Sequence, residues 1–287
     1  MRDLRLVRYD RAAGFLAVAG DYLVRQEAEH NLLLGICGRL RATPHLYGSD
    51  PYFAAVLGGD DVVGTAIRTP PYNLILSQLA DPAAVEALVA DAASMFPDVP
   101  GVLGPKEASR RFAELWTEAV GETAQLAMEE RIFRCSRVAA PSGVGGALRR
   151  AGVADRALLV DWMKAFVAEA LPDGTPRPAE SAVDDYLGRA GVEGAYIWDD
   201  GGPVSLAGCG NPTPNGMRVG PVYTPPELRG RGYASAAVAA LTQLALDSGR
   251  AFCFLFTDLA NPTSNKIYHR IGYEPVCDVD EYHFSSG

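Results

Sequence analysis

Hydrophobic and polar positions along the first half of the chain change period in a regular order, which indicates alternating helices and strands. The pattern predicts helices over residues 14–25 and 27–40, strands over 52–57, 62–68 and 72–79, a helix from Asp81, a strand over 99–103, a helix over 108–120 and a strand over 124–138. The segment Gly58-Gly59-Asp60-Asp61 between the first two strands is typical of a hairpin turn. Asp81-Pro82 is typical of a helix start.

The second half repeats this order. It predicts helices over 155–170 and 179–189, strands over 194–198, 204–210 and 217–223, a helix over 233–248, a strand over 251–257, a short helix from Asn261 that Gly272 ends, and one or two strands over 273–284. Between the halves, the segment Pro141 to Gly146 has the composition of a turn or linker. We therefore expect two domains, 1–140 and 147–287, each an α/β (α+β) unit.

Composition narrows the classes of protein. At 287 residues, with 48% hydrophobic and 21% charged residues, the chain has enough core material for two globular domains. No apolar run is long enough to span a bilayer, and the N-terminus lacks the apolar core of a signal peptide, so a cytoplasmic location is expected. The net charge of −9 disfavours nucleic acid and anionic membranes as partners but is compatible with a cationic amine.

Cysteine and histidine spacing adds no metal or disulfide chemistry. The 5 cysteines are dispersed without a C-x-x-C pair and are read as reduced thiols, and the 4 histidines lack metal-ligand spacing. We expect no metal, and the sequence leaves open whether the protein is a monomer or a homodimer.

The segment from Val222 to Ala234 carries the main chemical signal. A strand ends, a turn with Gly230 and Gly232 follows, and a helix begins at once. Unpaired amide groups and the helix dipole at such a start favour an anion such as a pyrophosphate. Glycines let the phosphate approach the backbone, and Arg229 and Arg231 add positive charge. An ordinary strand-to-helix turn is the alternative.

Two common phosphate-binding motifs do not fit this segment. A dinucleotide fingerprint would need glycine where Ser235 stands, and the Gly-Lys-Ser/Thr ending of a Walker loop is absent. The pattern that fits is R-x-x-G-x-A, formed by Arg229, Gly232 and Ala234 after Pro226. It resembles the pyrophosphate loop of the GNAT superfamily of acyl-CoA-dependent acyltransferases, Q/R-x-x-G-x-G/A.

A second segment resembles the same family. Its N-x-x-A/S-x-x-x-Y-x-x-x-G-F/Y pattern is matched, in order, by Asn261, Ser264, Tyr268, Gly272 and Tyr273. Each of these residues also has a purely structural interpretation, such as a helix cap or a packed ring. Two matched segments in the expected strand-helix-strand-helix context favour the family. The resemblance covers about residues 148–284.

The resemblance implies a mixed central sheet flanked by helices, in two tandem GNAT-like units. It also implies an N-acetyltransferase that uses acetyl-CoA as co-substrate and a primary amine as acceptor, with direct attack through a tetrahedral intermediate. The backbone of Val222 and Thr224 would contact pantetheine, and Tyr268 would be the catalytic residue that protonates the departing thiolate. The implied coenzyme A-binding residues are Val222, Tyr223, Thr224, Arg229, Gly230, Arg231, Gly232, Tyr233, Ala234, Asn261 and Ser264.

The acceptor side is less defined. The resemblance places it at the first two helices of the C-terminal half, with Phe166 and Glu169 as candidate contacts. The proline-rich loop 172–178 is either a lip over the acceptor site or a plain connection. A general base is left open among Glu169, Glu193, Asp199, Glu227 and a water chain.

Residues 1–140 are interpreted as a degenerate GNAT-like unit. Their nearest counterpart of the pyrophosphate loop is expected at Leu103 to Ala108, where a single glycine is followed by Pro105, which has no amide donor. This half would complete the acceptor cleft or stabilise the C-terminal half. Transfer of another acyl group, or a coenzyme A-binding sensor without turnover, are the alternative functions.

Overall fold

The computed structural model describes residues 3–96, 98–170 and 177–286, and the chain divides into two compact units. The first unit contains residues 1–132 and 276–287, and the second contains residues 133–275. The linker-like segment 141–146 therefore lies within the second unit, and the C-terminal strand belongs to the first. The chain just before that segment is held in the second unit, since the Ala139 amide donates to the Ile271 carbonyl at 3.0 Å.

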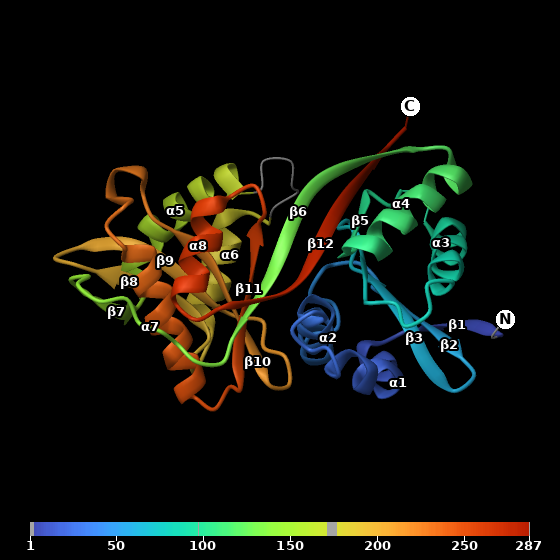
Figure 1. Ribbon diagram of the computed structural model, residues 1–287, viewed down its shortest axis with the longest axis horizontal. Helices are drawn as coiled ribbons and strands as arrows, with labels where there is room; N and C mark the ends of the chain where they lie inside the picture. The colour runs from blue at the N-terminus through green and yellow to red at the C-terminus, as the bar shows by residue number, and fades with distance from the viewer. Residues whose placement is uncertain (1–2, 97, 171–176, 287) are drawn as a thin grey trace. The chain divides into compact units, whose positions relative to one another are not determined.

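The first unit is a mixed sheet with helices on both faces (Figure 1). Its elements are β1 (Leu4–Tyr9), α1 (Ala12–Val24), α2 (Asn31–Ala42), β2 (Tyr52–Gly58), β3 (Asp61–Arg68), β4 (Leu74–Leu76), α3 (Ala84–Met95), β5 (Gly101–Pro105), α4 (Lys106–Val120) and most of β6 (Thr123–Cys135). The strand order is β1-β2-β3-β4-β5-β12-β6, with β4 and β5 parallel. Alternation along β2 directs Phe53 to α1 and α2 and Ala54 to α3 and α4.

The second unit repeats the arrangement. Its elements are β7 (Ala147–Arg150), η1 (Val153–Asp155), α5 (Arg156–Ala170), α6 (Ala179–Gly188), β8 (Gly194–Asp199), β9 (Pro203–Gly210), β10 (Gly216–Tyr223), η2 (Pro226–Leu228), α7 (Tyr233–Asp247), β11 (Phe252–Asp258) and α8 (Pro262–Arg270). The order β7-β8-β9-β10-β11 is antiparallel except for the parallel pair β10–β11. The α/β class and the repeated unit predicted from the sequence are confirmed.

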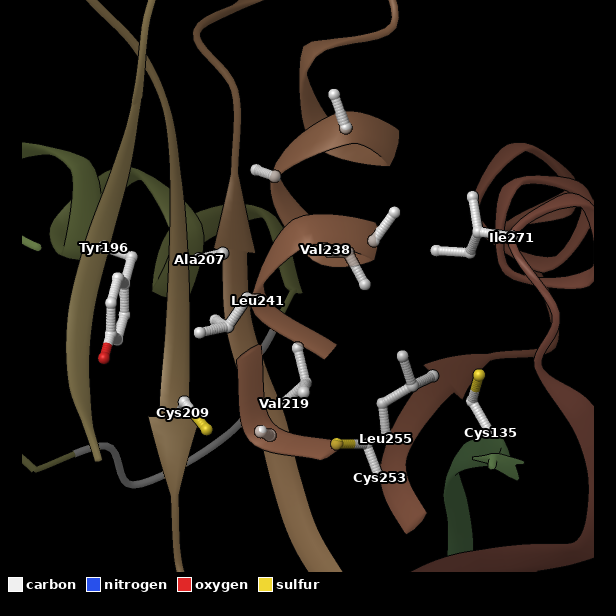
Figure 2. Packing of buried hydrophobic residues seen from close by; sticks show 14 of the residues in the cluster. Cys135, Tyr196, Ala207, Cys209, Val219, Val238, Leu241, Cys253, Leu255 and Ile271 are labelled. Atoms are coloured by element: carbon white, nitrogen blue, oxygen red, sulfur yellow. The ribbon is translucent and has the colours of Figure 1, made fainter. Parts of the chain in front are cut away.

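The core of the second unit shows how its sheet positions α7 (Figure 2). Tyr196 of β8 and Val219 of β10 face the apolar side of α7, which includes Val238 and Leu241. Ile197, next to Tyr196, points to the opposite face and packs with α5 and α6. Helices therefore cover both faces of this sheet, and the end of β10 lies between α7 on one face and α5 on the other.

The cysteines are packing residues of this fold. All five are free, and four of them are buried: Cys37, Cys135, Cys209 and Cys253. Burial raises the pKa of the Cys209 thiol to about 12. Such thiols stay protonated at neutral pH and are inert.

The two outer strands and the final strand go beyond the sequence pattern. β1 and β7 were not predicted, because short edge strands rich in arginine give a weak apolar signal. β12 (Glu274–Ser285) is one strand, and it pairs antiparallel with β5 from Val279↔Pro105 to His283↔Gly101. Among the described residues, none of the helices has both the length and the apolar character needed to cross a membrane.

Candidate functional site

The site begins where β10 and β11 part. The two strands pair in parallel from Gly216↔Phe252 to Arg218↔Phe254. β10 then continues to Tyr223 and β11 to Asp258 without further pairing to each other. Two strands that share a sheet but stop pairing expose backbone donors and acceptors along their facing edges. We call this feature the fork.

A bulge in β10 lies directly after the fork begins. Val219 pairs with Cys209 of β9 and Val222 with Ala207, so that Gly220 and Pro221 together oppose Gly208. A Cβ atom at Gly208 would lie 2.6 Å from the Gly220 carbonyl oxygen, which explains the glycine. Bulges redirect a strand and often adjoin functional sites. The Gly-Pro dipeptide inside an apolar strand was the sequence signal for it.

Glycines shape the loop between β10 and α7. Gly230 has φ +78° and Gly232, the N-cap residue of α7, has φ +84°, a region that L-residues with side chains rarely adopt. A Cβ atom at Gly232 would also lie 2.9 Å from Cγ2 of Val144. Both positions therefore require glycine for conformational reasons.

The amide groups of this loop are available to a ligand. Within the described part of the chain, no hydrogen bond is donated by the backbone N–H groups of residues 230–235. The first amide of α7 to donate is that of Ala236, to the Gly232 carbonyl at 3.0 Å. Free amides and the dipole of a 15-residue helix together make an anion-binding surface.

The Arg229 side chain lies back on the protein. Its Nε donates to the Thr224 carbonyl at 2.9 Å, and its Nη2 donates to the Glu169 carboxylate at 2.7 and 2.9 Å. This guanidinium links the end of β10, the loop and the last turn of α5. Glu169, predicted as an acceptor contact, is thereby brought to the loop arginine. Arg231 is exposed and donates only a long bond, 3.5 Å, to the Glu227 carbonyl.

The aromatic residues next to the loop are held by the core. The Tyr223 ring is buried on the α5 and α6 face, 6.3 Å from the Trp162 ring. The Tyr233 hydroxyl donates to Asp200 at 2.8 Å. Because the side chains of Tyr223 and Tyr233 contact other protein residues, only the backbone groups of these two residues are left to contact a ligand at the loop.

Of the remaining predicted residues of the strand and helices, Thr224 is buried, and Val222, Phe166 and Ala234 are partly buried. Val222 packs against the α7-side core and Phe166 against the α5 and α6 core. The hydroxyl of Thr224 shares a 2.9 Å hydrogen bond with that of Ser205, a contact that sequence reasoning missed. Ala234 lies half-buried in the first turn of α7. The fork, the bulge and the loop thus come together at one end of β10.

The second motif forms the start and body of α8. Asn261 is the N-cap, and its side chain accepts a hydrogen bond from the Ser264 amide at 3.1 Å. One turn on, the Tyr268 ring packs 5.9 Å from the Tyr273 ring and 6.4 Å from the Phe133 ring. The hydrogen bond between Asn261 and Ser264 thus caps α8, the helix that contains Tyr268.

The environment of Tyr268 suits a proton donor. Burial raises the pKa of its hydroxyl to about 12, so the phenol stays protonated at neutral pH. Among the described residues, none makes a hydrogen bond to this hydroxyl. The group is therefore protonated and available to a substrate atom.

Three of the four candidate general bases are already paired. Glu169 bonds to Arg229, Asp199 to Arg149 at 2.9 Å, and Glu193 lies 4.0 Å from Arg189. Within the described ranges, no group of three or more histidine, cysteine, aspartate or glutamate side chains is arranged to hold a metal ion. Residues 172–176 of the proline-rich loop lie outside the described residues.

The order of elements corrects the expected position of the loop's counterpart in the first unit. The β10–α7 junction corresponds to the β4–α3 junction, residues 77–83, because both follow the third strand of the hairpin meander. Leu103 to Ala108, expected as the counterpart, instead lies at the β5–α4 junction. The apolar pattern hid the junction after β4, because it predicted a strand over 72–79 whereas β4 ends at Leu76.

Comparison with known proteins identifies the fold. Residues 156–273 match the model of the acetyltransferase (GNAT) family. The structure is similar to an acetyltransferase of the GNAT family from Colwellia psychrerythraea, with a TM-score of 0.60, 12% identity and coverage of 98% of this chain and 100% of that one. It is also similar to a GCN5-related N-acetyltransferase from Sphaerobacter thermophilus, with a TM-score of 0.63, 16% identity and coverage of 96% and 94%.

A third similar structure is a tandem GNAT protein from the clavulanic acid biosynthesis pathway. It has a TM-score of 0.53 and 13% identity, and the match covers 99% of this chain and 98% of that one. At these identities the likeness shows the fold alone. A search of curated proteins by sequence finds no match.

Proposed function

We propose that this chain transfers an acetyl group from acetyl-CoA to a primary amine, because residues 156–273 match the GNAT acetyltransferase family. The observation that carries the proposal is the set of unpaired amides at residues 230–235, which lies next to the fork between β10 and β11. The amides suit the pyrophosphate, and the open strand edge suits the amide-containing pantetheine arm.

The residues of the loop divide this work. Gly230 and Gly232 keep the backbone accessible, and the amides of Tyr233 and Ala234 point along the start of α7. Arg229 acts through the loop conformation, since its guanidinium bonds to Thr224 and Glu169. Asn261 and Ser264 contribute by fixing the start of α8.

Transfer needs a nucleophilic amine, a polarised carbonyl and a protonated leaving group. The amine nitrogen bonds to the thioester carbonyl carbon and gives a tetrahedral intermediate with a negative charge on oxygen, and the proton lost by the amine passes to a carboxylate or to a water chain. The intermediate collapses as the carbon–sulfur bond breaks, and coenzyme A leaves as the thiol. Backbone amides near the bulge at Gly220 would stabilise the negative charge on the carbonyl oxygen. Tyr268 would supply the proton to sulfur, since its hydroxyl is protonated at neutral pH and makes no hydrogen bond to another described residue.

The proposal is tested by incubating the full chain with acetyl-CoA and a panel of amines. We expect free thiol and N-acetylated product to appear in equal amounts with at least one amine class. Tight acetyl-CoA binding without thiol release would instead support a coenzyme A sensor. If a longer acyl-CoA releases thiol faster than acetyl-CoA at the same amine concentration, that acyl group, and not acetyl, is the one transferred.

A further inference from the structure

Arg218 occupies the point where β10 and β11 separate. It forms the last pair of the parallel ladder, opposite Phe254. Its neighbours Met217 and Val219 face the α7-side core, so strand alternation directs the Arg218 side chain to the α5 and α6 face. The bulge at Gly220 follows two residues later, about 7 Å along the strand.

Arg218 has no carboxylate partner. It is half-buried, its guanidinium carbon lies 4.8 Å from the centroid of the Phe256 ring, and within the described part of the chain no acidic side chain forms an ion pair with it. Phe256 lies on the same sheet face, since Leu255 before it belongs to the α7-side core. A partly desolvated guanidinium without a counter-ion favours an external anion.

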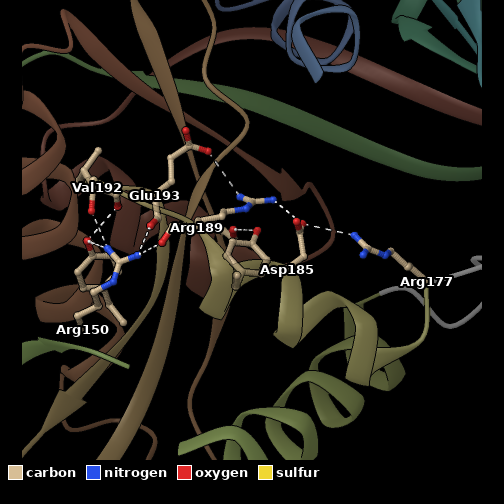
Figure 3. A network of polar contacts seen from close by, with 10 residues as sticks. Arg150, Arg177, Asp185, Arg189, Val192 and Glu193 are labelled. Atoms are coloured by element: carbon tan, nitrogen blue, oxygen red, sulfur yellow. Dashed lines mark hydrogen bonds and ion pairs between the residues drawn. The ribbon is translucent and has the colours of Figure 1, made fainter. Parts of the chain in front are cut away.

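Two acidic residues of this face, Asp185 and Glu193, are paired with arginines. Asp185 pairs with Arg189 at 2.8 Å and with Arg177 at 3.4 Å, and Glu193 lies 4.0 Å from Arg189 (Figure 3). These two carboxylates therefore balance the charges of Arg177 and Arg189. Among the described residues, Arg218 is left beside the fork with a positive charge and no ion-pair partner.

Tyr186 connects Arg218 to the reaction site. Its hydroxyl donates to the Gly220 carbonyl at 2.8 Å, within the bulge. Burial raises the pKa of the Tyr186 hydroxyl. The positive charges of Arg189 and, to a smaller extent, Arg218 lower this pKa. Both guanidinium groups must therefore lie near the hydroxyl. The unbalanced charge, the bulge and the start of the fork are thus neighbours on one sheet face.

We propose that the acceptor amine carries an oxyanionic group, a carboxylate or a phosphate, which Arg218 binds through its guanidinium fork. This inference rests on the proposed acetyl transfer and names its substrate class. The two-residue spacing between Arg218 and Gly220 favours a short separation between anion and amine. Arg218 is a specificity residue, and the Phe256 ring below it limits the directions of approach.

The test uses amines that share one carbon chain and differ in the end group: β-alanine, 2-aminoethyl phosphate and ethanolamine, with phenylalanine and phenethylamine as a second pair. We expect kcat/KM for an anionic member to exceed that of its neutral partner at least tenfold. Arg218→Met should remove this preference by raising KM for the anionic amine about tenfold, with KM for acetyl-CoA unchanged. Arg218→Lys should recover part of it, since charge remains but the fork is lost.

Arg134→Met is the matched control. Its guanidinium stacks on the Phe252 ring at 4.4 Å, where β10 and β11 are still paired, so this variant should keep the preference. Preference for the neutral members, or an equal loss for both members in Arg218→Met, would overturn the inference while leaving acetyl transfer intact. If acetyl-CoA binds but no amine reacts, the proposed reaction fails. Calorimetry of the same amines with the wild-type chain and with the Arg218→Met variant then still decides whether the anionic group is bound there.

Discussion

The two strand-to-helix junctions, β10–α7 in the second unit and β4–α3 in the first, occupy the same place in the repeated order of elements but use their backbone differently. At β10–α7 the amides of residues 230–235 have no acceptor among the described residues. At β4–α3 most of the amides donate to acceptors within the first unit. Ser77 donates to Thr65 at 3.0 Å, Ala80 to Val63 at 2.7 Å, and Gln78 to Nε2 of His30 at 3.0 Å.

The helix starts differ in the same way. In α3 the Ala83 amide donates to the Asp81 carboxylate and the Ala84 amide to the Asp81 carbonyl, both at 3.0 Å. A carboxylate at this position would also repel a phosphate. In α7 the N-cap is Gly232, which has no side chain to satisfy these donors.

The strands before these helices differ as well. A Cβ atom at Gly104 of β5 would lie 2.8 Å from Cβ of Leu76, the last residue of β4, so these strand ends are in close contact. β10 and β11 instead stop pairing at Arg218. One fold therefore supports a ligand-binding junction only when the sequence leaves the strand edge and helix amides unsatisfied.

The largest expected difference concerns stoichiometry. We predict one acetyl-CoA per chain, because an anion at the β4–α3 junction would meet Asp81 and amides that already have acceptors. Titration calorimetry on the intact protein measures the number directly. A value near two would show that the first unit rearranges to bind, and the contrast between the junctions would fail.

Next in size is the loss of the proposed proton donor. Tyr268→Phe should lower kcat about a hundredfold and change acetyl-CoA affinity less than threefold, because only the hydroxyl is removed. With a pKa of about 12, ionisation of Tyr268 should not limit kcat below about pH 11. Tyr273→Phe is the control, since that hydroxyl bonds to Thr242 at 2.7 Å in the core and its loss should affect stability alone. Equal kcat values for the wild type and Tyr268→Phe would return Tyr268 to a packing role.

A smaller effect is expected at the loop. Gly232→Ala should weaken acetyl-CoA binding about tenfold, because a side chain at φ +84° strains the loop and contacts Val144. Gly249→Ala tests the same strain at the other end of α7, where φ is +98° and no atom lies within 4 Å of the added Cβ. That control should lose stability but not affinity. A similar affinity loss in both variants would mean that strain, not the loop, sets binding.

The smallest expected effect concerns the β4–α3 junction of the first unit. Asp81→Ala removes the carboxylate that accepts from the amide of Ala83, the N-cap residue of α3, and should cost about 1 kcal/mol of unfolding free energy. Acetyl-CoA affinity and stoichiometry should stay unchanged, since the other amides of the junction keep their acceptors. Denaturant unfolding and calorimetry of the same preparation check both. A second binding event in this variant would show that Asp81 alone keeps the first unit from binding.

Much of the candidate site was readable from the sequence because its signals are local. Glycines at 230 and 232 predicted a tight loop, and they adopt positive φ values before α7. Asn261 before Pro262 predicted a helix start, and its side chain caps α8. The roles of these residues toward coenzyme A, and that of Tyr268, stay predictions.

Other features were beyond the sequence because they depend on residues far apart in the chain. The pairing of Glu169 with Arg229 joins positions 60 residues apart, and nothing in either segment specifies the partner. The isolation of Arg218 likewise became visible only when nearby carboxylates proved to be paired with other arginines.

By itself, the sequence determined the order of the helices and inner strands, the repeated α/β unit and the glycine-shaped loop, since periodicity and backbone preference act over a few residues. The edge strands β1 and β7 were missed. Only the tertiary structure decided that β12 joins the first unit, that β10 and β11 part at Arg218, and that most amides of the equivalent junction in the first unit already have acceptors. Strand pairing and hydrogen-bond satisfaction are choices among distant partners, and they are settled by which arrangement leaves the fewest buried polar groups unpaired.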